Sequence, residues 1–158
     1  MTHTELLTLF TYQDGKLFWK VARTNNIWVG KEITATNEYG YVIVGIGNKL
    51  YQVSRIIFCM HHGYMPEIVD HENRNTLDNK IDNLRAATKS QNGMNSKTPI
   101  TSTTGIKGVT YSISAKRWIS SVQVNKKQHK TRHLTKEEAI LATLQKREFY
   151  HKEFANNG

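Results

Sequence analysis

A stretch of ten residues, SKTPITSTTG at 96–105, divides the sequence because it is rich in Ser, Thr, Pro and Gly and almost lacks apolar side chains. This composition is typical of a linker. The chain has 158 residues, enough for one ordinary core or two small ones. We therefore predict an N-terminal domain at 1–96, a linker at 97–105 and a C-terminal domain at 106–158.

Several classes of protein are excluded by simple features of the chain. Apolar residues never run long enough to cross a membrane, and the start MTHTELLTLF lacks the basic flank and long apolar stretch of a signal peptide. Cys59 is the single cysteine, which excludes an intramolecular disulfide and a Cys-rich zinc site. Its apolar run, IIFCM, favours an inert core cysteine over a nucleophile. The sequence predicts a soluble protein of the cytoplasm, in a bacterium or a phage-infected host.

The first half of the N-terminal domain predicts a short helix at 4–10 followed by β structure. Aromatic and β-branched runs such as KLFWK, GYVIVGI and KLYQV flank turn signals, as half-buried strands do. We expect one small antiparallel sheet here. An apolar helix at 53–62 should follow and carry the core, and Gly63 and Pro66 should end it.

The segment 67–96 is unusually rich in Asn and Asp. It predicts a short strand at 68–69, a polar loop, a second strand at 84–87 and a helix that begins after Thr88, a natural N-cap. The helix has poor intrinsic propensity because Asn92, Gly93 and Asn95 lie close together. Packing or a ligand must therefore stabilise it.

The C-terminal domain predicts three strands, within KGVTYSI, RWISSVQV and KQHKTRHL, joined by turns at Ser114-Ala115 and Asn125-Lys126. Thr135, followed by Glu137 and Glu138, should cap a helix that runs from 136 to about 154. Its apolar positions include Ala139, Ala142, Leu144 and Phe149. The fold class is α+β, with a three-stranded antiparallel sheet packed on one helix in this domain.

Positive charge is concentrated near the C-terminus. The formal net charge is +9, yet residues 1–95 carry ten basic and nine acidic side chains, whereas 96–158 carry twelve and four. Such an excess favours polyanions, because each neutralised phosphate releases condensed counterions. A basic surface kept for solubility explains the charge equally well, so charge alone does not decide between them.

Hydrolysis of a phosphodiester needs a base to activate water and a divalent ion to neutralise the phosphoryl oxygens. Asp70 and His71 are adjacent at the end of a predicted strand, so their side chains point to opposite faces. Asn92 offers an amide oxygen 21 residues after His71. Asp70 and Asn92 together make an all-oxygen ligand set that suits Mg²⁺ or Mn²⁺ and that water and DNA phosphates must complete.

The blocks VDH, DNKIDNLR and QNGMN resemble the HNH nuclease motif, in the His-Asn-Asn form of phage and intron homing endonucleases. The resemblance implies a ββα-metal core at about 67–96. It also implies that His71 is the general base, that Asp70 and Asn92 bind the metal, and that Asn83 braces the loop. Arg85 is then placed to contact phosphate. The alternative is a long Asn-rich loop held by side-chain to backbone hydrogen bonds.

Further positions match the nuclease pattern in part. Asn79 and Asn95 match Asn positions, and we expect them to fix backbone turns, whereas Arg74 is a candidate DNA contact. The stretch GYVIVGIGNKLYQVSRIIF also parallels these nucleases, but Ser54 stands at the usual His position. Asn92 stands where many HNH enzymes have His, which should weaken affinity for softer metals such as Zn²⁺.

The C-terminal domain resembles the three-stranded DNA-binding domain of plant ethylene-response (APETALA-like) factors, in which the sheet lies in the major groove. Trp118 is favoured as a core residue, and His129, His133 and His151 as surface or core residues, because they lack metal-ligand spacing. The candidate DNA contacts implied by the resemblance are Lys107, Tyr111, Lys116, Arg117, Lys126, Lys130 and Arg132.

These patterns together predict a metal-dependent endonuclease that nicks or cleaves double-stranded DNA, with Mg²⁺ as cofactor. A monomer with one active site is favoured, and a dimer on a pseudo-palindromic site stays open. A catalytically inactive DNA-binding regulator is the alternative function. An RNA-binding protein ranks last, because the aromatic stacking signature of RNA-binding modules is missing.

Overall fold

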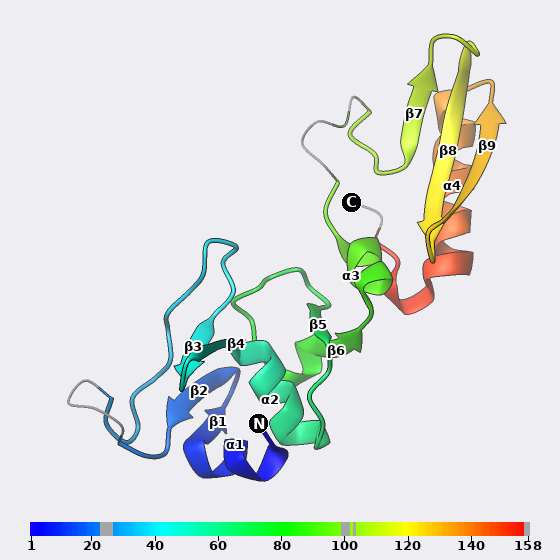
Figure 1. Ribbon diagram of the computed structural model, residues 1–158. Helices are drawn as coiled ribbons and strands as arrows, with labels where there is room; N and C mark the ends of the chain where they lie inside the picture. The colour runs from blue at the N-terminus through cyan, green and yellow to red at the C-terminus, as the bar shows by residue number, and fades with distance from the viewer. Residues whose placement is uncertain (23–26, 99–101, 103, 157–158) are drawn as a thin grey trace. The chain divides into compact units, whose positions relative to one another are not determined.

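The computed structural model describes residues 1–22, 27–98, 102 and 104–156, and Figure 1 shows its ribbon. Contacts divide the chain into two units, Met1–Thr88 and Lys89–Gly158. The predicted N-terminal domain at 1–96 thus extends past this division. Residues 99–101 and 103 of the predicted linker lie outside the described residues. Both units combine helices with small antiparallel sheets, so the α+β class is confirmed.

The first unit alternates short helices with two-stranded sheets. Its strands pair as β1–β2, β3–β4 and β5–β6, all antiparallel. In chain order its elements are α1 (His3–Leu9), β1 (Phe10–Gln13), β2 (Lys16–Trp19), β3 (Ile43–Ile46), β4 (Lys49–Gln52), α2 (Val53–His62), β5 (Ile68–His71), the 3-10 helix η1 (Ile81–Asn83) and β6 (Leu84–Ala87).

The N-terminal strands form two separate sheets instead of the one predicted sheet. The chain that follows β2 returns along the edge of this strand. There the backbone N–H of Trp19 donates to Lys31 O at 3.0 Å, and that of Ile33 donates to Leu17 O at 2.9 Å. Because these bonds occupy the outer edge of β2, that edge is not available to β3.

Helix α2 lies at the centre of the hydrophobic core of this unit. It spans the predicted residues Val53–His62 and ends at Gly63, which has a left-handed φ of 79°. Ile56, Ile57 and Cys59 are at most 1% exposed, which confirms Cys59 as a core residue. Burial raises the pKa of the Cys59 thiol. Ser54 is also buried, so the position that departs from the nuclease pattern belongs to the core.

The second unit is a three-stranded sheet, in the order β7-β8-β9, with α4 packed against it. The predicted turn Asn125-Lys126 joins β8 to β9 with positive φ at both residues, as two-residue hairpins require. The predicted cap is also confirmed, because Thr135 and Glu138 form a reciprocal capping box. The elements are α3 (Lys89–Asn95), β7 (Val109–Ser112), β8 (Arg117–Val124), β9 (Lys127–His133), α4 (Lys136–His151) and the 3-10 helix η2 (Lys152–Phe154).

The buried face of α4 is largely polar. Four residues at a spacing of four are buried, namely Ala139, Thr143, Arg147 and His151. The Thr143 hydroxyl donates to Ser120 Oγ at 2.8 Å, so the contact between helix and sheet includes a hydrogen bond. Phe149, one of the apolar positions of the predicted helix, is 72% exposed instead. Of the residues on the face that packs on the sheet, hydrophobic periodicity therefore identified only Ala139.

Candidate active site

The hairpin of β5 and β6 places Asp70 and His71 on opposite faces, as the strand period predicted. Asp70 lies opposite Arg85 in the antiparallel register, and His71 lies opposite Leu84. Leu84 belongs to the hydrophobic core, so His71 shares the face of the hairpin that packs on this core. Asp70 and His71 are each 4% exposed.

His71 is held by a side chain from the loop between β5 and β6. Its Nε2 lies 3.1 Å from Asn79 Oδ1, in a buried hydrogen bond. Because an amide oxygen only accepts hydrogen bonds, Nε2 carries the proton and Nδ1 has the lone pair. The ring of Tyr41 lies beside the imidazole, with 5.9 Å between ring centroids. Asn79 thus fixes both the orientation and the tautomer of His71.

The environment keeps His71 neutral. Burial lowers the pKa of His71 from its ordinary value of 6.5, and this effect exceeds the opposing ones of the Asn79 hydrogen bond and of the Asp70 and Asp78 charges. A neutral imidazole with its lone pair on Nδ1 is the form that accepts a proton. His71 is therefore prepared to act as a base near neutral pH.

Asp70 forms a buried ion pair with Arg85. Both Nε and Nη2 of Arg85 contact Asp70 Oδ2, at 2.9 and 2.8 Å. Arg85 Nη1 also reaches Glu72 Oε1 at 3.6 Å. The guanidinium neutralises the carboxylate and orients it. Arg85 thus contacts Asp70, a predicted metal ligand. The sequence had predicted only a contact between Arg85 and phosphate.

Asn83 connects the two ends of the polar loop. Its Oδ1 accepts from the backbone N–H of Asn73 at 2.9 Å, and its Nδ2 donates to Asp78 O at 2.7 Å. These are the contacts of a loop brace, the role that the resemblance implied. The loop also contacts the segment that precedes β3, because Thr76 Oγ1 donates to Gly40 O at 2.9 Å.

The first hairpin of the chain supports the same loop. The backbone N–H of Ile81 donates to the Tyr12 hydroxyl at 3.2 Å. Gly15, in the turn between β1 and β2, has a φ of +83°, and a Cβ there would lie 3.0 Å from Lys80 N and 3.3 Å from Asn79 C. The turn therefore needs glycine for its conformation and for close packing against Asn79, the residue that holds His71.

The other predicted nuclease residues are Asn92, Asn95 and Arg74. Asn92 and Asn95 belong to α3, in the second unit, where Asn92 is half-buried and Asn95 is buried. The Asn95 carbonyl accepts from Asn156 Nδ2 at 2.7 Å. Arg74 has a positive φ of 63°, and its backbone N–H donates to His71 O at 2.9 Å. The pairing of Asp70 with Asn92 at one metal stays a prediction. Among the described residues, no group of three or more His, Cys, Asp and Glu side chains could hold a metal ion.

Three of the candidate DNA contacts share one face of the second sheet. Lys130 and Arg132 lie opposite Ser121 and Ile119 in the register, on the face that carries Arg117 and points away from α4. We call Arg117, Lys130 and Arg132 the basic face, and all three are exposed. Lys116 and Lys126 are exposed in the turns at the two ends of β8.

Tyr111 and Lys107 differ from these candidates. Tyr111 lies opposite Trp118, with 5.1 Å between ring centroids, on the α4 side of the sheet. Trp118 is half-buried there, under the ammonium of Lys136, so it lies at the margin of the core. Lys107 Nζ donates to the carbonyl oxygens of Gly93, Met94 and Ser96 at 2.8–3.1 Å.

The sequence analysis missed two features of the site. It predicted Tyr41 only as part of a strand, and it assigned Asn79 to a backbone turn rather than to His71. The run GYVIVGI, which starts at Gly40, was the available signal for Tyr41. For Asn79 the match to an Asn position of the nuclease pattern was a signal, but its contact with His71 depends on the path of the loop.

Comparison with known proteins agrees with the position of this site. The HNH endonuclease family matches residues 51–94, which include α2, the hairpin of β5 and β6, and nearly all of α3. Protein 3.8 of Escherichia phage T7 is 34% identical over 87 residues, which cover 55% of this chain and 72% of the relative. No solved structure matches significantly. In the described part of the chain, no helix combines the length and apolarity needed to span a membrane. The chain therefore belongs to the family of phage T7 Protein 3.8 and carries an HNH endonuclease domain.

Proposed function

We propose that this protein is a metal-dependent endonuclease of the homing type that hydrolyses phosphodiester bonds in double-stranded DNA. The observation that carries the proposal is His71, a buried imidazole whose Nε2 is hydrogen-bonded to Asn79 and whose Nδ1 has the lone pair. The matched HNH endonuclease family supports the nuclease class. The His-Asn-Asn pattern supports the homing type.

His71 acts as the general base in this proposal. Its Nδ1 takes a proton from the attacking water, while Nε2 keeps its hydrogen bond to Asn79 and prevents the ring from rotating. Attack on phosphorus breaks the bond to the 3′-oxygen, which takes a proton from solvent, so the products carry 5′-phosphate and 3′-hydroxyl ends. Positioned general bases contribute about 10²–10⁴ in rate.

Asp70 and Asn92 are the proposed ligands of one Mg²⁺, for which Mn²⁺ can substitute. The buried carboxylate of Asp70 is a hard oxygen donor already oriented by Arg85, and such donors fit Mg²⁺ better than softer metals. The pairing with Asn92 rests on sequence spacing. When bound, the ion would supply charge stabilisation at the phosphoryl and leaving oxygens. Arg85 holds the Asp70 carboxylate in place through its two contacts with Oδ2.

The second unit is the proposed DNA grip. The basic face is exposed and lies on the side of the sheet that points away from α4. DNA phosphates can therefore reach Arg117, Lys130 and Arg132. The resemblance to ethylene-response domains supports binding of the sheet in the major groove. Arg74, Lys116 and Lys126 are further contacts, and the protein acts as a monomer.

The function is tested with supercoiled plasmid, Mg²⁺ and the purified full chain. We expect relaxed or linear plasmid with Mg²⁺ and none with EDTA, measured by gel electrophoresis. Salt-sensitive binding of the plasmid without any cleavage, with Mg²⁺ and with Mn²⁺, would contradict the nuclease and favour the DNA-binding regulator. A mock preparation from cells without the gene controls for contaminating nucleases.

Asn79 gives a prediction that depends on its role in positioning His71. In Asn79→Ala the hydrogen bond that raises the pKa of His71 is lost, so the acidic limb of the pH–rate profile should move to lower pH. The rate at neutral pH should fall about 10–100-fold, as for other hydrogen-bond partners of functional histidines. The profile is measured by plasmid cleavage in a series of buffers.

Asn79→Asp distinguishes positioning from a merely structural role. The carboxylate keeps an acceptor for Nε2 and adds a negative charge, which raises the pKa of His71 and moves the acidic limb to higher pH. Asn48→Ala, in the exposed turn between β3 and β4, is the matched control and should leave the profile unchanged. Equal profiles for all three variants would exclude the proposed role of Asn79.

A further inference from the structure

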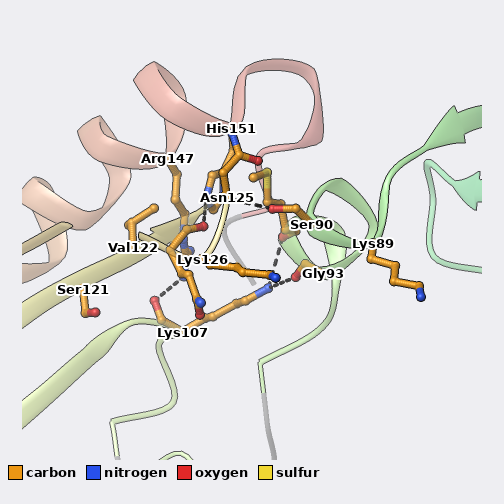
Figure 2. Close-up of a pocket in the computed structure, with 12 residues that line it drawn as sticks. Lys89, Ser90, Gly93, Lys107, Ser121, Val122, Asn125, Lys126, Arg147 and His151 are labelled. Atoms are coloured by element: carbon orange, nitrogen blue, oxygen red, sulfur yellow. Dashed lines mark hydrogen bonds between the residues drawn. The ribbon is translucent and has the colours of Figure 1, made fainter. Parts of the chain in front are cut away.

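The second unit contains a cavity of about 640 Å³. Figure 2 shows its walls, which come from α3, the turn between β8 and β9, the end of α4 and Lys107. None of the described residues that line it is acidic, whereas five are basic side chains. These are Lys89, Lys107, Lys126, Arg147 and His151. Positive charge thus surrounds this space.

Arg147 is the most deeply buried of these basic residues, at 2% exposure. Its Nη2 donates to the carbonyl oxygen of Lys107. Its Nη1 is buried and has no hydrogen-bond partner among the described residues. A buried guanidinium N–H without a partner is destabilising, so an acceptor within the cavity would stabilise the fold.

His151 lies one helical turn after Arg147 and is 7% exposed. Its Nε2 contacts Gln123 O at 3.3 Å, and since a carbonyl only accepts, Nε2 carries the proton. The buried Nδ1, which then has the lone pair, has no partner among the described residues. Burial, together with the charges of Arg147 and Lys107, lowers the pKa of His151. The ring is therefore a neutral acceptor in need of a donor.

Lys107 completes the cationic wall. Its ammonium donates to the carbonyl oxygens at the end of α3, while burial and the neighbouring Arg147 lower the pKa of Lys107 to about 8. Two like charges in one buried place are unfavourable unless an anion lies between them or beside them. A cation or an apolar molecule in the cavity would leave this repulsion and the unpaired N–H in place.

We propose that this cavity binds a phosphate that carries a proton, with Arg147 Nη1 donating to a phosphate oxygen and the phosphate hydroxyl donating to His151 Nδ1. Monohydrogen phosphate has both ionised oxygens and a hydroxyl at neutral pH, so it can accept from Arg147 and donate to His151. A phosphate monoester has a hydroxyl only as its monoanion, because a second pKa of about 6 leaves it without a proton at higher pH. Sulfate has no hydroxyl at neutral pH and leaves His151 Nδ1 unpaired. A phosphodiester within a DNA strand lacks the hydroxyl as well.

Two sources share this chemistry, namely inorganic phosphate and, in its monoanionic form, the 5′-phosphate at a DNA end. Binding of inorganic phosphate does not depend on the proposed nuclease function. Binding of a 5′-phosphate end rests on the proposed nuclease function, because such an end is the proposed reaction product. The two sources are separated by titrating inorganic phosphate and, in a second experiment at about pH 6, where part of the monoester carries a proton, oligonucleotides that differ only in a 5′-phosphate.

The test is calorimetric titration of the full chain with sodium phosphate at about pH 8, where His151 is neutral, and with sodium sulfate at equal ionic strength. We expect saturable binding of phosphate and at least about 10-fold weaker binding of sulfate, because a site that pairs with a hydroxyl rejects ligands without one. No heat with phosphate, or equal affinity for both anions, would overturn the proposal.

Variants link the binding to the two buried groups. His151→Phe should abolish the preference for phosphate over sulfate, and Arg147→Gln should weaken both anions about 10-fold or more, as loss of a charged hydrogen-bond donor does. Lys49→Gln, which removes an exposed charge from β4 in the first unit, is the charge-matched control and should bind phosphate as the parent chain does. Circular dichroism verifies that each variant is folded.

If Arg147→Gln does not fold, His151→Phe alone decides the question. Unchanged discrimination between phosphate and sulfate in His151→Phe overturns the proposal. In the oligonucleotide experiment, tighter binding of the 5′-phosphorylated strand identifies the DNA end as the ligand, and equal binding of both strands identifies inorganic phosphate. Cleavage of plasmid is scored separately, so failure of the nuclease proposal leaves the titration result intact.

Discussion

Replacement of His71 by Ala is expected to reduce plasmid cleavage by about 10²–10⁴, the contribution of a positioned general base. DNA affinity should remain close to that of the parent chain, because His71 is buried and does not belong to the basic face. Initial rates of nicking with Mg²⁺ measure the first effect, and a fluorescence anisotropy titration with a DNA duplex measures the second.

Two further variants show whether the loss is chemical. His71→Gln keeps a side-chain amide that can donate to Asn79 but has no basic nitrogen, so it should fold and remain inactive. His62→Ala removes an exposed histidine of α2 and should cleave at the parent rate. Cleavage by His71→Gln at the rate of the parent chain would refute the assignment of the base.

Replacement of Asp70 by Ala should have two separable effects. It removes the proposed metal ligand, so cleavage should fall by at least about 10²–10³, as expected when charge stabilisation of the transition state is lost. It also leaves Arg85, 16% exposed, without its carboxylate partner. Breaking a buried ion pair costs about 3–5 kcal/mol. The cost should lie near the lower value here, because Glu72 Oε1, 3.6 Å from Arg85 Nη1, still partly balances the charge of Arg85. Urea denaturation measures this change in the free energy of unfolding.

The double variant Asp70→Ala, Arg85→Met separates the two effects. Replacing both members of a buried pair by uncharged groups is often neutral for stability, so the free energy of unfolding should return close to that of the parent chain. Cleavage should stay lost. Full recovery of cleavage together with stability would mean that Asp70 only maintains the fold. Arg85→Met alone, compared at several Mg²⁺ concentrations, reports how much the guanidinium orients the carboxylate.

Local sequence signals predicted the elements that depend on neighbouring residues. The apolar run and Gly63 located α2, because a left-handed glycine ends a helix within one turn. The turn Asn125-Lys126 and the cap at Thr135 were equally local. Asp70 and His71 were assigned to opposite faces from the two-residue period of a strand. The nuclease motif was recognisable for the same reason, because each of its blocks is short, and the HNH endonuclease match over residues 51–94 contains all three blocks except for Asn95.

Features that depend on distant residues were not predictable in this way. The split of the N-terminal sheet depends on the return of the chain along β2. Most of the buried face of α4 escaped detection because it contains Thr143, Arg147 and His151, which no hydrophobic pattern marks. Each is buried only because a particular part of β8 or the segment before β7 supplies a hydrogen-bond partner or a packing surface.

His71 shows which properties of the site depend on the sequence and which depend on the tertiary structure. The sequence alone determined that a histidine follows an acidic residue at the end of a strand, within an HNH motif, and from this we predicted that it serves as a base. Only the tertiary structure decided which nitrogen carries the proton and that burial lowers the pKa of the ring. Residue type and spacing are properties of the local chain, whereas desolvation and a hydrogen bond to Asn79 arise when the loop folds back over the hairpin.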